Sequence, residues 1–341
     1  MSRKRHQRSR QRKKHQGMRI SWLILFVIAI IVAYYAFVIS PIEFEELGLL
    51  TDETSAPDFT PTPYPTPIAP IISGDHLDLD VLSAYMLELI NVDRVAHGLQ
   101  PVVWDNLAAE VGRLHAEDMA AAGYMSHWNM AGLGPDIRYN RAGGRDVVME
   151  NVFSSYQRYD DGSPVYEADW AARVREAQEA LMNSPGHRAN ILTPEHTHVG
   201  VGMAYDAQTG EFRVAQEFLN RYISVDTGFV DQIVIAKPGD SFAFGISLLT
   251  GVAQPLINLA YEPLPQPLTI SELDETSTYE SPAVFVEQIN HSVSLGGDMS
   301  IPVNIPQIPE SGYYHVRIWI NVNGEQIPAS DIVISVSTNS D

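Results

Sequence analysis

The 341-residue chain contains no cysteine, so neither a disulfide framework nor a lipid-modified cysteine can hold it together or anchor it. A protein without cross-links has to be stabilised by a hydrophobic core of sufficient size. With about 300 residues beyond the first 39, two globular domains can bury such cores.

Basic residues are scarce after position 19. Nine of the 22 Lys and Arg residues lie in residues 1–19, which leaves 13 against 42 Asp and Glu residues in the rest of the chain. An acidic surface of this kind repels DNA, RNA and anionic lipid headgroups. We therefore expect a soluble ectodomain and no nucleic-acid partner.

Three common catalytic signatures are missing as well. The chain has no Gly-x-Ser-x-Gly elbow, no His-Glu-x-x-His zinc helix and no Gly-Lys-Ser/Thr phosphate loop. Gly200-Val201-Gly202 lacks the third glycine of a dinucleotide-binding turn and falls inside an expected strand. Nucleotide chemistry is therefore not expected.

An uncharged run occupies residues 20–39, directly after the basic residues 1–19. Twenty helical residues at about 1.5 Å each span about 30 Å, the thickness of a bilayer core. The run is longer than the apolar region of a cleavable signal peptide, and Tyr34, Tyr35 and Phe37 suit a membrane interface. We predict one transmembrane helix over residues 20–39, a basic cytoplasmic tail over 1–19 and a single-pass protein of the cell membrane. A buried core helix and a basic arm that binds nucleic acid are the alternative interpretations.

Residues 40–75 are rich in Pro and Thr and are expected to form a linker. Six prolines lie between positions 55 and 72, mostly alternating with small residues, which favours extended polyproline II over a packed core. The domains beyond the linker are expected to be extracytoplasmic.

Residues 76–222 show helical periodicity followed by a hairpin pattern. Leu82, Met86, Leu89 and Ile90 define one apolar helix face, and Gly98 is the natural end of that helix. A second helix is expected from the cap at Asp105 or Asn106 to Gly123, a third over about 168–182, and strands over Thr197–Tyr205 and Glu211–Leu219. Helices and antiparallel strands that mix without strict alternation predict an α+β fold.

Residues 223–341 show no helical period. Short β-rich runs recur between Pro and Gly residues, at Gln232–Ala236, Ser241–Leu248, Leu256–Ala260, Val284–Gln288, Met299–Ile305, Tyr313–Val322 and Asp331–Val336. Asn323-Gly324 is a strong signal for a two-residue hairpin turn. About seven short strands predict an all-β, immunoglobulin-like sandwich.

A set of ordered motifs runs through the first of these regions. In chain order they are Asn91-Val92-Asp93-Arg94, His97-Gly98-Leu99, Trp104-Asp105, His115-Ala116-Glu117-Asp118-Met119, Ser126-His127, Glu150-Asn151 and the block 181–202, which contains Ser184-Pro185-Gly186-His187 and the glycine-spaced strand Val199-Gly200-Val201-Gly202. Pro185 and Gly186 are expected to end the third helix and turn the chain. The ordered set resembles the CAP superfamily, the SCP/PR-1-like secretory proteins, in its cysteine-free bacterial form. The resemblance implies that the α+β region is an α-β-α sandwich.

The resemblance also implies a cleft with two histidines and two glutamates. His127, Glu150 and His187 match three of these positions, and the two histidines are the expected ligands of zinc or another divalent metal. The second glutamate has no secure match, and Glu176 and Glu179 on the third helix are the nearest possibilities. Met149 stands where the family has a glycine before the glutamate, and Leu181 where it commonly has a tryptophan.

Each candidate has a structural alternative. The two candidate histidines can serve only as cleft walls, Glu150 as a backbone anchor and Asn151 as a loop-ordering residue. His196 and His198, two apart on an expected strand, are read as ordinary strand-edge residues rather than a metal pair. His115 is read as a helix packing residue.

These features favour a membrane-anchored, extracytoplasmic binding or effector module, with an extracellular ligand that is a lipid, a glycan or a protein. The first alternative is a metal-assisted hydrolase in which Glu150 acts as the base. The second is an adhesion or envelope protein that acts through the β-sandwich.

Overall fold

The computed structural model describes residues 64–70, 77–156, 169–226, 228, 233–248, 253–290, 292–293, 299–307, 310–322 and 324–338. Residues 60–341 make up one compact unit. The predicted tail over 1–19, the predicted membrane segment over 20–39 and all of the 40–75 linker except residues 64–70 lie outside the described residues. A search of the described helices finds none with the length and apolarity needed to cross a membrane.

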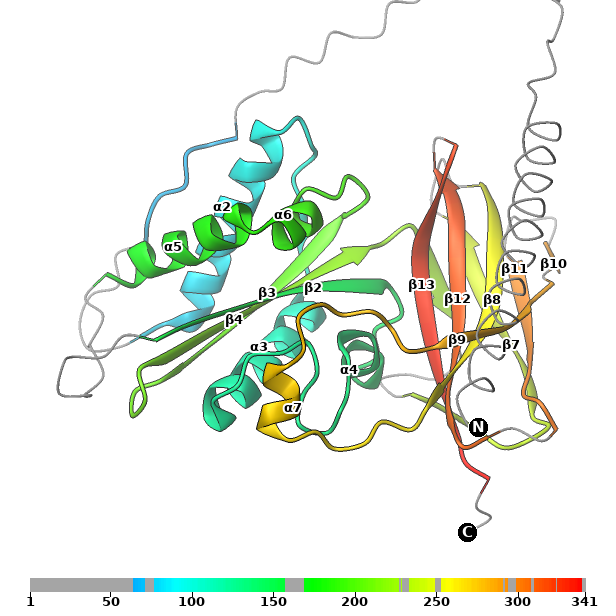
Figure 1. The fold of residues 1–341 in the computed structure, drawn as a ribbon. Coiled ribbons are helices and arrows are strands. Elements are labelled where there is room, and N and C mark those ends of the chain that lie inside the picture. Colours follow the sequence, from blue (N-terminus) through cyan, green and yellow to red (C-terminus); the bar gives the residue numbers. More distant parts are fainter. Residues whose placement is uncertain are drawn as a thin grey trace, which may run out of the picture. The chain divides into compact units, whose positions relative to one another are not determined.

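The first part of the unit is a four-stranded sheet between two layers of helices (Figure 1). The strands lie in the order β1 (Val103–Trp104), β3 (His198–Asp206), β4 (Glu211–Asn220) and β2 (Val147–Tyr156). One face packs on α2 (Leu79–Ala96) and α5 (Trp170–Asn183), with α6 (Pro185–Ile191) on the same side, and the other on α3 (Asn106–Ala122) and α4 (Pro135–Arg141). The predicted α+β fold with an α-β-α sandwich is therefore confirmed.

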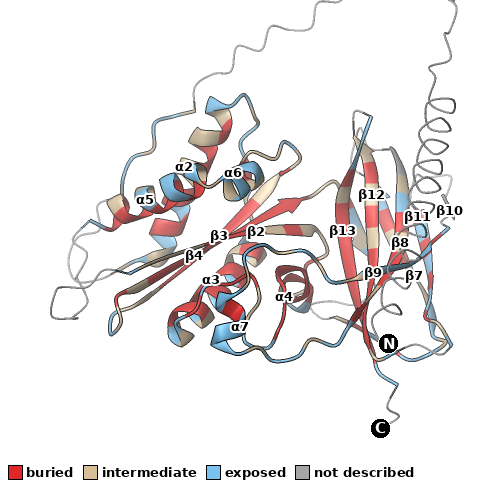
Figure 2. Cartoon of the chain, in the orientation of Figure 1, coloured by how far each residue is buried: buried red, intermediate tan, exposed pale blue. Residues whose placement is uncertain are grey.

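Alternation along β4 explains why both sheet faces are covered. Phe212, Val214 and Phe218 enter the core under α2 and α5, whereas Ala215 and Leu219 pack with residues of α3 and α4. Successive strand residues point to opposite faces, so a strand this buried is apolar on both. Nearly the whole of β4 is buried (Figure 2).

Gly200 and Gly202 of β3 allow helix α3 to lie directly on the sheet. A Cβ atom on Gly200 would lie 2.0 Å from the backbone nitrogen of Ala109, and one on Gly202 would lie 1.9 Å from that of Arg113. Helix α3 begins as expected at the Asp105 cap, whose carboxylate accepts from Ala108 N at 2.8 Å, and ends at Gly123 with φ of 74°. The glycine-spaced strand β3 therefore fixes the position of α3 and of the residues that follow α3 in the sequence.

The second part consists of two further sheets that share one core. One sheet has the order β10-β11-β7-β5 and the other β6-β13-β12-β8-β9. Their strands are β5 (Ile223–Asp226), β6 (Val234–Ala236), β7 (Ser241–Leu248), β8 (Ala253–Pro263), β9 (Val284–Gln288), β10 (Ser292–Val293), β11 (Met299–Asn304), β12 (Gly312–Val322) and β13 (Glu325–Val336). Phe244 and Ile301 of the first sheet and Ile318 of the second are each fully buried in that core.

The strand positions in this part agree with the sequence. Each of the seven predicted runs overlaps a strand, and Val322 pairs with Glu325 across the expected two-residue turn. The short helix α7 (Ile270–Asp274) departs from the all-β expectation. The immunoglobulin-like type of the sandwich stays a prediction.

The two parts are joined through buried polar contacts. The Asn140 side chain on α4, fully buried, donates to Asp331 O at 2.8 Å and accepts from Val333 N at 3.0 Å, both on β13. Ile137 and Val333 are fully buried in one apolar cluster across the same junction. The predicted boundary at residues 222/223 coincides with the change of sheet, while the independence of the two halves stays a prediction.

A long connection leaves the sandwich and reaches the first sheet's helices. Residues 264–281, here called the strap, join β8 to β9 and include the short helix α7 (Ile270–Asp274). Leu273 of α7 is fully buried against residues of α3, β2 and β4, and Leu268 N donates to Met130 O at 3.0 Å. Figure 1 shows α7 beside α3. The strap therefore belongs structurally to the first part of the unit.

Candidate functional site

The candidate site is a cleft of about 540 Å³ over the edge strand β2. His127, which follows α3, lines it from one side and His187 on α6 from the other, while Glu150 and Asn151 come from β2 itself. The structure therefore brings all three predicted site residues to one cleft.

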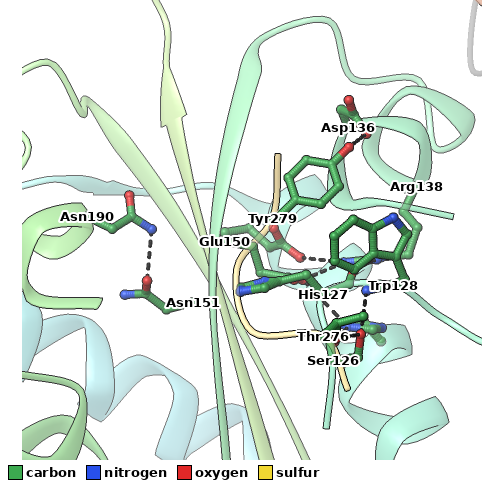
Figure 3. Close-up of polar contacts among 12 residues, drawn as sticks. Ser126, His127, Trp128, Asp136, Arg138, Glu150, Asn151, Asn190, Thr276 and Tyr279 are labelled. Carbon is green, nitrogen blue, oxygen red and sulfur yellow. Dashed lines mark hydrogen bonds and ion pairs between the residues drawn. The ribbon is translucent and has the colours of Figure 1, made fainter. Parts of the chain in front are cut away.

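His127 and Glu150 form the central contact of the site (Figure 3). His127 Nδ1 lies 2.8 Å from Glu150 Oε1, and both side chains are largely or fully buried. A carboxylate only accepts, so Nδ1 carries the proton and donates it to this bond. His127 Nε2 is then left with its lone pair. A carboxylate that fixes the tautomer of a histidine in this way is a common arrangement behind metal-binding histidines.

Glu150 is held as a carboxylate by the cation Arg138 and by the hydrogen bond from His127. Its other oxygen, Oε2, is paired with Arg138 and lies 3.8 Å from His115 Nε2. Burial by itself raises the pKa of Glu150, but the charge of Arg138, with His115 and His127, outweighs it and holds the pKa far below its usual range. Both oxygens are therefore occupied and the group stays ionised.

Glu217 lies next to Glu150 and was not predicted from the sequence. The two glutamates are directly opposite each other in the β2–β4 pairing, and Glu217 is fully buried. Burial, followed by repulsion from Glu150, raises the pKa of Glu217 well above its usual value, although Arg138 lies 3.8 Å away. Neither carboxylate oxygen has a hydrogen-bond partner among the described residues. Glu217 is therefore a second buried carboxyl group, directly opposite Glu150, and its surroundings favour its protonated form.

The expectation that Glu176 or Glu179 supplies this group is wrong. Both are exposed on α5 and neither lines the cleft. One signal in the sequence pointed to Glu217: it is an acid in the mostly apolar second half of a strand that was itself predicted. Such a residue in a doubly covered strand is buried, and a buried acid demands a reason.

His187 lies on a helix rather than after a turn. The expected turn at Ser184-Pro185-Gly186 is replaced by a break at Ser184, after which Pro185 starts α6. Pro at the first helical position is favourable there because its missing N–H would be unpaired in any case. Burial, followed by electrostatic interaction with His127, lowers the pKa of His187, which favours its neutral imidazole form.

Asn151 orders the helix that carries His187. Its amide nitrogen donates to His187 O at 3.2 Å, and its oxygen accepts from Asn190 Nδ2 at 3.0 Å (Figure 3). The loop-ordering role expected for Asn151 is therefore observed.

The other histidines are packing residues of different kinds. His196 is buried, contacts the side chains of Asn220 and Asn190 at 2.8 Å and stacks on Phe218. Strand β3 begins only at His198, so His196 and His198 do not lie on the same strand. His115 is buried as predicted, yet it lies beside Glu150 and contacts Ser126 O at 2.8 Å. Burial, with the charge of Arg138, lowers the pKa of His115 to about 4. It is therefore a neutral support of the site.

A second group of ligand-type residues lies at the junction between the two parts. Asp136, His315 and Asp331 are the one group of three or more among the described residues whose ligand atoms all lie within 4.8 Å of one another. His315 contacts Asp331 at 3.0 Å and Glu262 at 3.2 Å, and although burial opposes it, these carboxylates raise the pKa of His315 to about 10. A protonated imidazole cannot bind a metal, so this group is an ion-pair cluster that joins the two halves.

The strap supplies the remaining wall of the cleft. Ser277, Thr278 and Tyr279 line it, and the Tyr279 ring lies 5.0 Å from Trp128 and 6.4 Å from His127 between ring centroids. Nothing in the sequence motifs pointed to these residues, because they lie more than 120 positions after His127.

Comparison with known proteins agrees with this architecture. Residues 87–218 match the family model described as CAP, the cysteine-rich secretory protein family. The chain is 33% identical over 127 residues to the "Uncharacterized membrane protein YlbC" of Bacillus subtilis (strain 168), covering 37% of this chain and 33% of that one. It is 31% identical over 124 residues to the "Uncharacterized protein YkwD" of the same strain, covering 36% and 43%. The chain thus spans less than half the length of either relative.

Among solved structures, a crystal structure of an extracellular protein containing an SCP domain from Bacillus anthracis str. Ames is similar. It shares 26% identity, with 44% of this chain and 45% of that chain covered and a TM-score of 0.34. The ordered motifs, the α-β-α sandwich and the family match at residues 87–218 agree, and this part of the chain is a CAP domain of the cysteine-rich secretory protein family.

Proposed function

We propose that the protein is a membrane-anchored, extracytoplasmic CAP-domain module that binds a ligand in the cleft between His127 and His187, with a divalent metal at these two imidazoles. The observation that carries this proposal is the 2.8 Å contact between His127 Nδ1 and Glu150 Oε1, which leaves Nε2 free for the ligand side. His187, neutral and in the same cleft, is a suitable second ligand.

The donor chemistry fits zinc or a similar ion. Neutral imidazole nitrogens are common zinc ligands, and a hydrogen-bonded carboxylate behind one of them raises its basicity. Two protein ligands leave coordination positions open, so a bound metal would polarise a ligand in the cleft. Affinity is expected to be modest because Glu150 is occupied by Arg138 and His127.

The same occupancy favours binding over hydrolysis. A general base needs a pKa near the working pH and access to the proton that it removes. Glu150 is fully buried, has its pKa held far below that range and has both oxygens paired. We therefore rank the hydrolase below the binding module.

Membrane anchoring rests on the uncharged residues 20–39 and their basic flank. The printed name of one relative, a membrane protein, supports it. Protease added to intact cells is expected to remove the part of the chain beyond residue 55. Full protection of that part would contradict this orientation.

Calorimetric titration of the detergent-solubilised full chain with Zn²⁺ tests the metal site. We expect one site that the double substitution His127→Ala/His187→Ala removes, and that weakens on acidification because protons compete with the metal for imidazole nitrogens. The matched control is His97→Ala/His198→Ala, because neither of these histidines lines the cleft. Equal zinc affinity in the wild type and the cleft variant would refute the proposal.

A further inference from the structure

We infer that the cleft binds a neutral, polyhydroxylated ligand, a segment of a glycan, and that Tyr279 of the strap determines this specificity by offering its ring to a sugar face. The inference rests on the proposed function, because it assumes that the cleft is the ligand site. It assigns a binding role to a residue contributed from outside the CAP domain.

The charge of the cleft lining points to a neutral ligand. Among the described residues, Glu150 is the one carboxylate that lines the cleft, and it is paired with Arg138; no Lys, Arg or Asp side chain of these residues lines the cleft. Away from the proposed metal position, the described side chains of the cleft therefore offer a charged group no partner of opposite sign, and burying an unpaired charge is costly.

The polar groups of the lining are of the kind that bind sugars. Hydroxyl and amide side chains predominate, contributed by Ser184, Asn190, Thr193, Ser277 and Thr278. Ser277 and Thr278 are exposed, and no hydrogen bond of their side chains is found within the described part of the chain. Each hydroxyl both donates and accepts, as the hydroxyls of a saccharide do. An acyl chain would leave the hydroxyls of Ser277 and Thr278 unpaired.

The Tyr279 ring is held in place before any ligand arrives. Its hydroxyl donates to Asp136 Oδ1, and its ring packs on Trp128 at an angle of 57°. Gly134 makes this position possible, because a Cβ there would lie 2.4 Å from the tyrosine oxygen. An aromatic ring that needs no reordering binds at lower entropic cost.

The strap itself is anchored on the CAP domain near the cleft. Ser126, the neighbour of His127, contacts Thr276 through their hydroxyl oxygens at 2.7 Å, and Trp128 N donates to Ser126 Oγ at 3.1 Å (Figure 3). Leu273 is fully buried below these residues. The strap therefore places Tyr279 beside His127 as a fixed wall of the site.

The test is a calorimetric titration of the full chain with four probes: a β1,4-linked N-acetylglucosamine tetramer, a β1,4-linked glucose tetramer, a heparin tetrasaccharide and palmitate. We expect at least one neutral tetrasaccharide to bind. Tyr279→Ala is expected to weaken that binding about tenfold, as loss of a buried aromatic anchor does, whereas Tyr279→Phe keeps the ring and most of the affinity. Tyr156→Ala, an exposed tyrosine at the far end of β2, is the matched control and should change nothing.

Two further measurements separate the possible failures. The zinc affinity of each variant shows whether the cleft is intact, and the double substitution Ser277→Ala/Thr278→Ala, at exposed positions, probes the strap without disturbing the core. The inference would be overturned if neither neutral tetrasaccharide binds, or if only heparin or palmitate binds. Retained zinc binding in that case would leave the proposed function standing. Equal glycan affinity of Tyr279→Ala and the wild type would overturn the role of Tyr279.

Discussion

Arg138 is the cation on which the buried carboxyl groups of the cleft depend. Its guanidinium is paired with Glu150, lies 3.8 Å from Glu217 and donates to the carbonyl oxygens of His127 and Leu133 at 2.6 and 3.0 Å. Arg138→Met keeps much of the side-chain volume and removes the charge and all these donors. The Glu150 carboxylate would then be buried beside a histidine and no cation.

Removing one partner of a buried ion pair costs about 3–5 kcal/mol. A loss of this size corresponds to a fall in melting temperature of about 6 °C or more for a unit of this size. The matched control is Arg113→Met, because Arg113 pairs with Glu110 and Glu117 on the exposed face of α3. Exposed pairs contribute less than about 1 kcal/mol, so this variant should melt within about 2 °C of the wild type.

The loss should also depend on pH, with a sign that follows from Glu150. In the wild type its folded pKa lies below the unfolded value, so its stabilising contribution is present above the unfolded pKa and is lost on acidification. Without Arg138 the folded pKa of Glu150 rises instead, and protonation on acidification relieves the buried charge. The difference in melting temperature should therefore shrink from pH 7.5 to pH 5. A difference below about 2 °C at pH 7.5, or one that is independent of pH, would refute this account of the site.

Three other substitutions test neighbouring parts of the structure by thermal melting. Glu217→Gln should not destabilise the protein at pH 7, because burial and the neighbouring Glu150 disfavour the charged form of Glu217, and Gln carries no charge. The stability of the wild type falls as pH rises from the unfolded pKa toward the raised folded pKa, whereas Gln does not titrate, so the variant should gain on the wild type as pH rises; a loss above about 2 kcal/mol at pH 7 would contradict the raised pKa. Gly202→Ala should destabilise the protein by about 2 kcal/mol or more because its Cβ would meet the backbone of α3. Gly186→Ala, with open space around the Cβ, is the tolerated control. Equal melting temperatures of the two variants would argue against the close approach of β3 and α3. His315→Gln should destabilise the junction by about 3–5 kcal/mol at pH 7. The folded pKa of His315 is raised to about 10, so its contribution to the free energy of unfolding is complete below about pH 6.5 and is lost as pH approaches 10. The destabilisation caused by His315→Gln should therefore shrink as pH rises, and a destabilisation that grows with pH would contradict this account.

Local sequence features predicted the elements better than the way in which they meet. The Asp105 cap and the Gly123 end of α3 depend on neighbouring residues alone, and both were found where expected. The α6 helix was missed because Pro185 reads equally as a turn residue and as a first helical residue.

The site residues divide in the same way. His127, Glu150 and His187 belong to motifs that are continuous in the sequence, and the cleft brings them together. Glu217 was missed because its position beside Glu150 is set by the register of β2 and β4, which no local pattern records. Tyr279 reaches the site only through a strap that leaves a different sheet.

The central claim is that His127 Nε2 and His187 are a metal-binding pair, with Glu150 behind His127 as its orienting partner. The most direct measurement is anomalous diffraction at the zinc edge from crystals of the protein grown with Zn²⁺. We predict one strong peak in the cleft, within bonding distance of His127 Nε2 and His187, at about 2.0–2.1 Å from each nitrogen. A peak at Asp136, His315 and Asp331 instead, or none in the cleft, would contradict the claim.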